Sequence, residues 1–314
     1  MDENNKNRYS QIRHEFLQKY NSELLPFLLK FESERKSVLL KANILFALSL
    51  AAVLALLYIY LAPEGKKEGE IFMLLAIPPS IWFWFQHKFE TKIKERIMPK
   101  VCKCFGNLVW MNEITLNITK QTLGERFYES SGLVPASDMS KDDIFIGDWD
   151  GVNIDIVESS FSTGSGKNRH SVFDGVFVVL DMNKSFSGHT VIKPKQFIDL
   201  KPFKHLNEIK LEDVEFNKTY KVYSTDEVEA RYLITPSFME RLKRMKVAFS
   251  ADNVRCAFFD KYLIIGLATT KDLFSIASIK KPMNDSKQYF QMFEEMLSII
   301  KLIDHFKLNQ KIGL

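Results

Sequence analysis

Three carboxylates are the strongest candidates for chemistry in this sequence. Asp174 lies inside an apolar run, where a buried carboxylate would need a partner. Asp226 and Glu229 lie at the start of a predicted helix, and such a pair can act as acid and base. Their spacing does not show that they converge. A sheet-edge position for Asp174, and a solvated helix start in which Glu227 pairs with Arg231, explain the same residues.

The glycine-rich stretch Thr163–Lys167 (TGSGK) resembles part of a phosphate-binding loop. Such a loop needs a glycine where this chain has Phe161, and a serine or threonine where it has Asn168. A strand also follows where a helix should begin, so no helix N-terminus would face the phosphate. The pattern favours the flexible tip of a β-hairpin.

Metal and redox chemistry have little support in the sequence. Cys102 and Cys104 have no second ligand pair elsewhere, and Cys256 lies in a predicted strand, so we expect free thiols. The histidines are scattered, at positions His14, His87, His170, His189, His205 and His305. We therefore expect no metal and no cofactor, and enzyme status stays open with no recognisable catalytic set.

The elements that would position any site begin with a membrane anchor. Residues 42–62 carry no charge, and as a helix they would span ~31 Å, close to the ~30 Å of a bilayer core. A second apolar run covers 71–86 and contains Pro78 and Pro79, which remove backbone donors and kink a helix. Residues 42–86 therefore predict a two-helix transmembrane hairpin, although a re-entrant second segment is the alternative.

Charges beside the hairpin predict its orientation. The connecting loop, 63–70, holds two lysines and three glutamates, whereas both flanks are basic. By the positive-inside rule the loop faces outward, and both termini face the cytoplasm. The cations after the second segment are expected to contact the membrane surface, namely Lys88, Lys92, Lys94, Arg96 and Lys100.

The flanking segments divide the rest of the chain. Residues 1–41 predict an amphipathic helical segment, which would lie on the membrane or pack on the soluble domain. Residues 87–112 predict a basic juxtamembrane helix, and 113–314 a soluble cytoplasmic domain. The predicted strands of that domain are 144–148, 152–156, 173–180, 189–192, 219–223, 254–259 and 262–267.

Helices follow late in this domain. Ser224 and Glu227 predict a capping box, and Thr235–Pro236 predicts an N-cap followed by a proline at the first helical position. A last helix is predicted at 286–307, with its apolar stripe on the sheet. The predicted fold class is α+β: an N-terminal helical region with a transmembrane hairpin, then a mainly antiparallel β-sheet with packed C-terminal helices.

Three stretches together resemble a known bacterial membrane family, catalogued as domain of unknown function 3137. They are 131–147 (SGLVPASDMSKDDIFIG), 173–192 (FDGVFVVLDMNKSFSGHTVI) and 215–242 (EFNKTYKVYSTDEVEARYLITPSFMERL). The resemblance implies an inner-membrane protein with two transmembrane segments, a soluble C-terminal domain and no assigned activity. It implies no catalytic residues.

Three functional hypotheses follow. The first is a membrane-tethered cytoplasmic domain for binding or scaffolding, with a protein partner or self-association. The second is a hydrolase-like membrane-associated enzyme using the carboxylates named above. The third is a lipid-surface sensor acting through the basic segment after the hairpin. A formal charge of +4 is too small to indicate nucleic acid as a partner.

Overall fold

The structure is a computed structural model that describes residues 3–61, 69–103, 105, 107–111, 125–134, 138–182, 184–195, 205–271, 273–274 and 278–310. The chain forms two compact units, which are described separately. The helical unit comprises Met1–Cys104 with Ser275–Tyr289, and the sheet unit comprises Phe105–Phe274 with Phe290–Leu314. The predicted α+β class with a mainly antiparallel sheet is confirmed.

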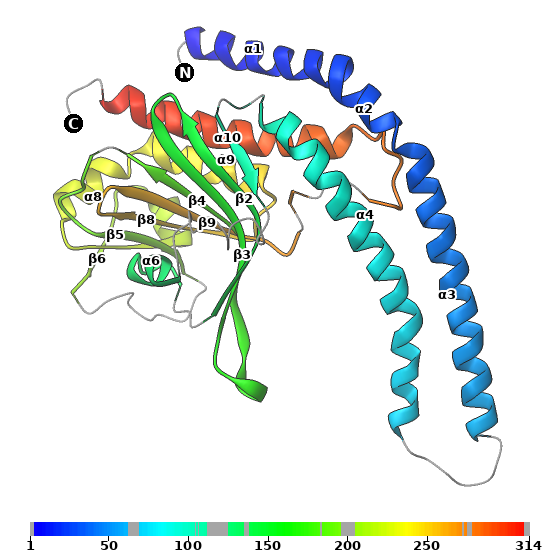
Figure 1. The fold of residues 1–314 in the computed structure, drawn as a ribbon. Coiled ribbons are helices and arrows are strands. Elements are labelled where there is room, and N and C mark those ends of the chain that lie inside the picture. Colours follow the sequence, from blue (N-terminus) through cyan, green and yellow to red (C-terminus); the bar gives the residue numbers. More distant parts are fainter. Residues whose placement is uncertain are drawn as a thin grey trace. The chain divides into compact units, whose positions relative to one another are not determined.

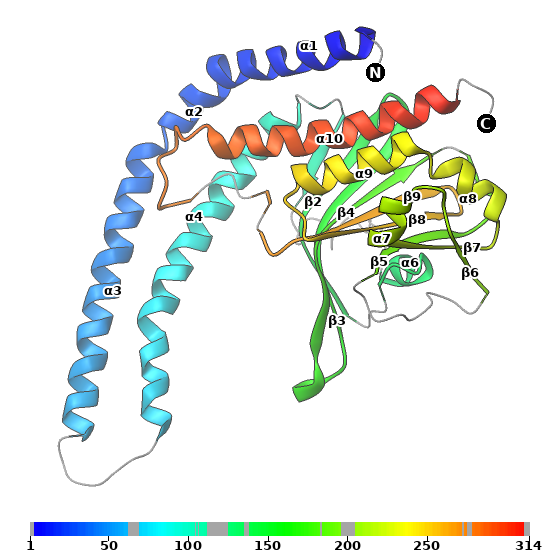
Figure 2. The ribbon, with the colours of Figure 1, turned by 180° about the vertical axis from the view of Figure 1, so that it is seen from behind.

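The helical unit is built from a series of helices near the N-terminus (Figure 1). They are α1 (Glu3–Lys19), a π-helical turn (Tyr20–Leu24), α2 (Leu25–Leu29), α3 (Glu32–Leu61), a 3-10 helix (Gly69–Ala76) and α4 (Ile77–Cys102). Helices α3 and α4 lie side by side as a hairpin, with α3 continuing well beyond the charge-free run in the N-terminal direction (Figures 1 and 2).

The second apolar segment differs from the predicted kinked span. Pro78 and Pro79 do not interrupt a helix, because α4 begins at Ile77 and both prolines lie in its first turn. A first-turn proline costs little, since the N–H that it lacks would have no partner within the helix. The Ser80 hydroxyl donates to the Ala76 carbonyl at 2.7 Å, and the residues before Ile77 form the 3-10 helix. Residues 71–86 are therefore not one continuous α-helix.

Within the described residues, α3 is the one helix long and apolar enough to cross a membrane. The qualifying stretch is Glu32–Ile59, and only 17% of its most apolar window is buried. The prediction of two transmembrane helices is thus supported for the first helix alone, because α4 turns charged soon after its apolar first turns.

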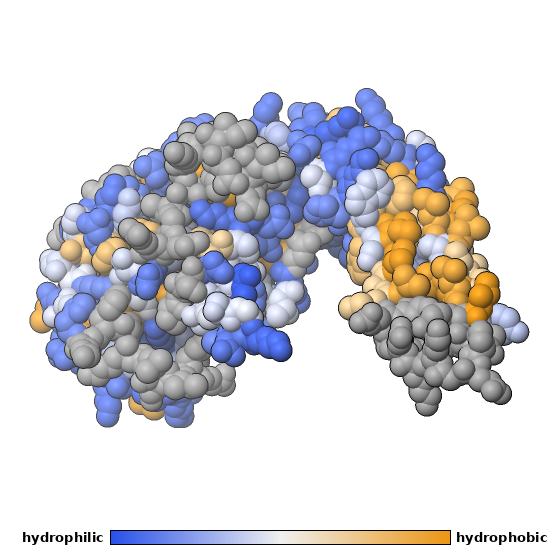
Figure 3. Space-filling view, turned by 60° about the horizontal axis from the view of Figure 1, so that its bottom comes forward, coloured by the Kyte–Doolittle hydropathy of each residue, from blue (hydrophilic) through white to orange (hydrophobic). Residues whose placement is uncertain are grey.

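Exposed apolar side chains gather on the helical hairpin (Figure 3). Both of its helices expose large hydrophobic residues, as does the 3-10 helix between them: Leu40, Ile44, Leu45, Leu48, Leu54, Leu56, Tyr58, Ile59, Met73, Leu75, Ile77, Phe83 and Trp84. Water would not favour so large an apolar surface, which marks a contact with protein or lipid.

The sheet unit contains nine described strands, and all of their pairings are antiparallel. The strands are β1 (Val109–Met111), β2 (Asp138–Trp149), β3 (Val152–Thr163), β4 (His170–Asp181), β5 (Thr190–Pro194), β6 (Asn207–Ile209), β7 (Tyr220–Ser224), β8 (Asn253–Phe259) and β9 (Tyr262–Ala268). Their order in the sheet is β1-β2-β3-β4-β9-β8-β5-β7-β6.

Tight turns set the register of this sheet. The β2–β3 hairpin turns at Asp150 and Gly151, which both have positive φ (52° and 78°), the conformation of the turn that matches strand twist. The predicted hairpins 144–156 and 254–267 are confirmed, and the predicted central strand 173–180 lies between β3 and β9. The TGSGK stretch forms the tip of the β3–β4 hairpin, as predicted.

Helices cover both faces of the sheet (Figures 1 and 2). On one face α6 (Glu125–Ser130) places Tyr128 against Phe161 and Phe177, with ring centroids 5.5 and 4.7 Å apart. The other face holds α9 (Pro236–Ala248) and α10 (Lys287–Gln310), and Phe238 of α9 lies 5.5 Å from Phe258. Short helices α7 (Val214–Thr219) and α8 (Glu227–Leu233) complete the unit.

One predicted helix cap is correct and the other is wrong. Thr235 caps α9 by accepting from the Phe238 N–H at 3.2 Å, as predicted. Helix α8 is capped by Asp226, which accepts from the Glu229 N–H, and not by Ser224. Ser224 ends β7, where its hydroxyl contacts the backbone of Asp226. Because α8 begins at Glu227, Ser224 lies two residues before the N-cap, and the predicted capping box does not form.

Candidate functional site

An irregularity in the sheet concentrates carboxylates at one point. The pairing of β2 with β3 shifts between Lys141 and Ile144, so that Asp142 and Asp143 together oppose Glu158. Such a bulge re-aims side chains that regular alternation would send to opposite faces. One carboxylate oxygen from each of the three acidic residues lies within 4.8 Å of the other two.

These three carboxylates are not equivalent. Asp143 is buried and accepts from the Trp110 indole N–H at 2.6 Å, and Glu158 accepts from the Leu273 N–H at 3.5 Å. Asp142 is exposed. Carboxylate oxygens are the ligands that Mg²⁺ and Ca²⁺ prefer, but the indole already occupies one Asp143 oxygen. Exposed acidic groups of this kind are common without a metal, and the three residues alone do not define an ion site.

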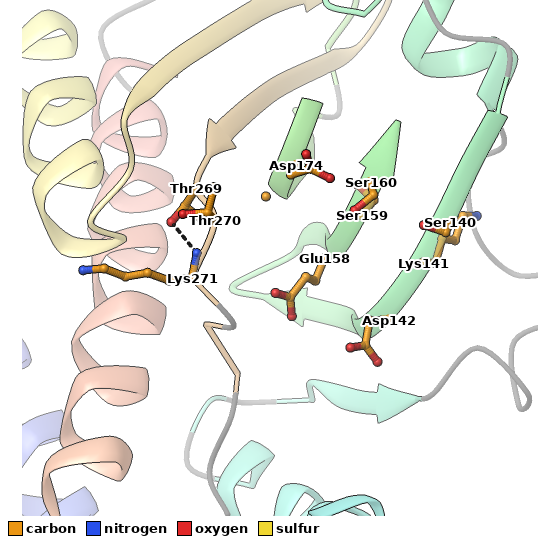
Figure 4. Close-up of a pocket in the computed structure, with 11 residues that line it drawn as sticks. Ser140, Lys141, Asp142, Glu158, Ser159, Ser160, Asp174, Thr269, Thr270 and Lys271 are labelled. Atoms are coloured by element: carbon orange, nitrogen blue, oxygen red, sulfur yellow. Dashed lines mark hydrogen bonds between the residues drawn. The ribbon is translucent and has the colours of Figure 1, made fainter. Parts of the chain in front are cut away.

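Asp142 and Glu158 border a polar pocket of about 530 Å³ in the sheet unit (Figure 4). Its walls come from β2, β3, β4 and the chain after β9: Ser140, Lys141, Asp142, Glu158, Ser159, Ser160, Asp174, Gly175, Thr269, Thr270 and Lys271. The close-up shows the Glu158 and Asp142 carboxylates pointing into the same space, whereas the Lys271 ammonium points away. The pocket can therefore accept a polar or cationic group.

Asp174, a carboxylate singled out from the sequence, lines this pocket. The Ser171 hydroxyl donates to its Oδ2 at 2.5 Å, and its carbonyl accepts from the Thr269 N–H at 2.8 Å. Its side chain is half-exposed, so the apolar strand leaves it at the edge of the packed region and not in the core. Because β4 lies between β3 and β9, Asp174 is not at an edge of the sheet as expected, and its half-exposed position lies where the β4–β9 pairing ends.

Asp226 and Glu229 lie elsewhere and bind backbone. Asp226 caps α8, and the Glu229 carboxylate accepts from the Ser187 and Gly188 N–H groups at 2.8 and 2.6 Å. Glu229 therefore fastens the loop before β5 to the start of α8. Neither residue lines the polar pocket, and a catalytic role for either stays a prediction.

A second pocket contains a carboxylate with an unusual pKa. It has a volume of about 430 Å³ and is lined by Asn107, Ile146, Gly147, Asp148, Asn153, Asp155, Val179, Asp181 and Tyr262. Burial raises the pKa of Asp155 to about 6, although nearby Lys141 opposes the shift. Beside it, Asp181 forms an ion pair with Lys261 at 2.6 Å. Asp155 is thus poised to exchange a proton near neutral pH.

Sequence reasoning missed Asp142, Glu158 and Asp155. The first two are brought together by the bulge, which no local pattern reveals. Asp155 lies between Ile154 and Ile156 in a predicted strand and was not singled out from the sequence. The burial of the Asp155 side chain depends on the neighbouring strands, which the alternation of apolar and polar residues along one strand does not reveal.

The cations expected at the membrane surface lie along α4. Three of them stack on aromatic rings of the helical unit: Lys88 on Trp84 at 4.8 Å, Arg96 on Phe31 at 5.4 Å, and Lys100 on Phe27 at 4.9 Å. Lys92 forms an ion pair with Glu34, and Lys94 is half-buried. Lys88, Arg96 and Lys100 remain exposed and able to meet anionic lipid.

The structure describes two of the three cysteines that were expected to be free thiols. Cys102 and Cys256 are both buried, and burial raises the pKa of the Cys256 thiol. Cys104 lies outside the described residues, so the predicted pair of thiols cannot be placed as a pair. Neither described cysteine has the exposure that a reactive thiolate needs.

Comparison with known proteins confirms the family resemblance. Residues 171–308 match the family model described as "Protein of unknown function (DUF3137)". This segment runs from β4 to α10 and contains Asp174, Asp226 and Glu229. No curated protein matches the chain.

One solved structure is similar at low level: the crystal structure of the mycobacterial trehalose monomycolate transport factor A. The match covers 62% of this chain and 84% of that chain, at 8% sequence identity and a TM-score of 0.34. A likeness of this size carries no argument about fold or function.

Proposed function

We propose that this chain is a membrane-anchored protein of the inner membrane, whose sheet unit acts in the cytoplasm as a binding or scaffolding domain. The single observation that carries this proposal is the exposed apolar surface of the α3–α4 hairpin. In a water-soluble protein this surface would be covered, whereas in a bilayer it needs no protein partner.

The dimensions of both segments suit a hairpin with two passes. The charge-free part of α3 from Ala42 to Leu61 measures about 30 Å, which equals the bilayer core. In the second segment, Ile71–Ala76 as a 3-10 helix and Ile77–Phe85 as an α-helix together reach about 25 Å. A shorter segment is accommodated by local thinning of the bilayer at modest cost. The basic residues of α4 support an orientation with both termini in the cytoplasm, by the positive-inside rule.

Charged substitutions on the exposed surface of α3 test the anchor. Leu48 and Leu54 are 61% and 52% exposed, so arginine at either position would be harmless if water surrounded them. At the centre of a membrane span each arginine costs about 2.5–3.5 kcal/mol. We expect the Leu48→Arg, Leu54→Arg double variant to leave the membrane fraction, as measured by alkaline carbonate extraction.

Val247 provides the matched control, because it is 78% exposed on α9 of the sheet unit. Val247→Arg should remain in the membrane as the wild type does. If the α3 double variant also stays, the anchor is wrong. Orientation is read separately from a reporter fused after Leu314, and activity confined to a periplasmic reporter would reverse it.

An enzyme is the second candidate, and the polar pocket beside Asp142, Glu158 and Asp174 is the observation that favours it. Carboxylates that line one cleft are common general acids and bases in enzymes. We expect a polar metabolite that uses this pocket to raise the unfolding temperature of the wild type but not of Glu158→Gln. The scaffold would be favoured by two results together. Glu158→Gln would leave the capture of protein partners unchanged, and no metabolite would raise the unfolding temperature of the wild type.

A further inference from the structure

A third cleft lies within the helical unit, at the α3–α4 hairpin. It has a volume of about 330 Å³ and is lined by Asn43, Phe46, Pro79, Trp82, Phe83 and Lys280. Five of these residues belong to α3 and α4, and Lys280 comes from a segment more than 170 residues later in the chain. The cleft therefore combines apolar walls with one cation.

Two hydrogen bonds hold the Lys280 segment against the start of α3. The Arg35 guanidinium donates to the Ile279 carbonyl at 2.6 Å, and the Met283 N–H donates to the Glu32 carboxylate at 3.0 Å. Glu32 and Arg35 also bind each other at 2.7 Å. These contacts hold the backbone on both sides of Lys280, whose side chain lines the cleft.

The cation and the aromatic ring form one recognition surface. The Lys280 Nζ lies 4.4 Å from the centre of the Trp82 ring, and Lys280 itself is exposed. Among the described residues no carboxylate pairs with Lys280, so its charge is available to an outside anion. A cation stacked on an indole retains its donors for a further ligand.

Asn43 supplies a second donor to the cleft. Its Oδ1 accepts from the Trp82 indole N–H at 3.2 Å, which joins α3 and α4 at one level. Asn43 is exposed, and this hydrogen bond uses its oxygen and not its amide nitrogen, which can donate to an acceptor. Asn43 is the second residue of the charge-free run, and tryptophan is enriched where lipid chains meet headgroups.

We propose that this cleft binds an anionic phospholipid, with its phosphate at Lys280 and Asn43 and its acyl chain on Phe46, Pro79 and Phe83. The proposal rests on the membrane anchor proposed above and names the lipid contact of that anchor. A phosphate accepts from an ammonium and an amide, whereas the apolar walls suit hydrocarbon.

Quenching of tryptophan by brominated lipid tests the site in the full chain. The protein is reconstituted in phosphatidylcholine vesicles that contain brominated phosphatidylglycerol or, separately, brominated phosphatidylcholine. We expect stronger quenching by the phosphatidylglycerol, and its loss in Trp82→Phe identifies Trp82 as the reporter. Lys280→Gln should reduce the preference about fivefold, the effect of one basic residue near a lipid phosphate.

Lys281→Gln is the matched control, because the neighbouring lysine is exposed and does not line the cleft. It should keep the wild-type preference. Equal quenching by both lipids in the wild type, or equal loss in Lys281→Gln and Lys280→Gln, would overturn the site while leaving the anchor intact. Absence of quenching by either lipid would overturn the anchor itself.

Discussion

At the scale of single residues, burial determines which carboxylates titrate near neutral pH. Glu295 of α10 has no exposed surface, and burial raises its pKa to about 8 despite a hydrogen bond from Gln291 and the nearby charge of Lys271. An unfolded glutamate titrates near 4.3. The folded sheet unit therefore binds this proton more tightly than the unfolded chain, so stability falls as the pH rises between about 4 and 8.

Glu295→Gln should remove this pH dependence. The amide has nearly the same shape but no charge, so we expect the variant to unfold at a temperature several degrees above the wild type at pH 8. The difference should shrink toward zero at pH 5, where wild-type Glu295 is protonated in the folded state. Thermal unfolding of the full chain in detergent micelles, followed by circular dichroism, measures both values.

Glu294→Gln gives the control on the same helix, because Glu294 is half-buried and next in sequence. Its difference from the wild type should not grow between pH 5 and pH 8. A Glu295→Gln variant that is less stable than the wild type at pH 8 would contradict the argument.

Which residues the sequence could identify depends on how local their roles are. The Thr235 cap was predictable, because it needs only the next three residues. Asp174 was recognisable as a polar residue in an apolar strand. Asp142 and Glu158 meet across two strands, and the shift that joins them is set by the register of the whole β2–β3 hairpin. The pocket that they line could therefore not be predicted without the pairing of the strands.

At the scale of elements, the contact between β4 and β9 depends on one glycine. Gly175 has φ of 146°, and a Cβ added there would lie 2.1 Å from the Leu267 carbonyl oxygen. Because this neighbour is backbone inside the sheet, it cannot move aside without breaking the pairing. Glycine is required at this position by both conformation and space.

Gly175→Ala should therefore destabilise the sheet unit by more than about 3 kcal/mol. Gly151 offers the comparison, since it also has positive φ (78°) but nothing within 4 Å of an added Cβ. Gly151→Ala should cost only about 1 kcal/mol of conformational strain. Urea unfolding of the full chain in micelles gives both free energies, and equal costs would show that the clash is relieved.

Elements with a strong local signal were predicted well from the sequence. The alternation and turns of β2, β3, β8 and β9 located those strands, although β2 and β3 are longer than expected. The helix predicted at 286–307 corresponds to α10. Pro78 and Pro79 were interpreted wrongly because a proline in the middle of an apolar run resembles a kink. Whether a helix starts at that proline depends on the residues before it.

At the scale of the whole molecule, the helical unit includes a segment from near the C-terminus. Residues 278–289 join this unit, and the contacts of Glu32 and Arg35 account for the attachment. The Arg35 hydrogen bond and the Met283 N–H lower the pKa of Glu32 to about 2. Glu32 therefore stays ionised down to that pH. The stability from this contact is fully present above about pH 4.3, and it is lost as the pH falls toward 2.

Arg35→Ala should release this segment while leaving the hairpin in the membrane. Removing the guanidinium leaves the buried Ile279 carbonyl without its donor and weakens Glu32 as acceptor for the Met283 N–H, so the amides of 279–283 should exchange at least tenfold faster. Lys36→Ala is the matched control, because the Lys36 side chain is 70% exposed and lies 3.9 Å from Glu32. Hydrogen exchange with mass spectrometry on the full chain measures the difference. Unchanged exchange at 279–283 would show that other contacts hold the segment. Because the same backbone positions Lys280, Arg35→Ala should also weaken the preference for phosphatidylglycerol that quenching of Trp82 reports.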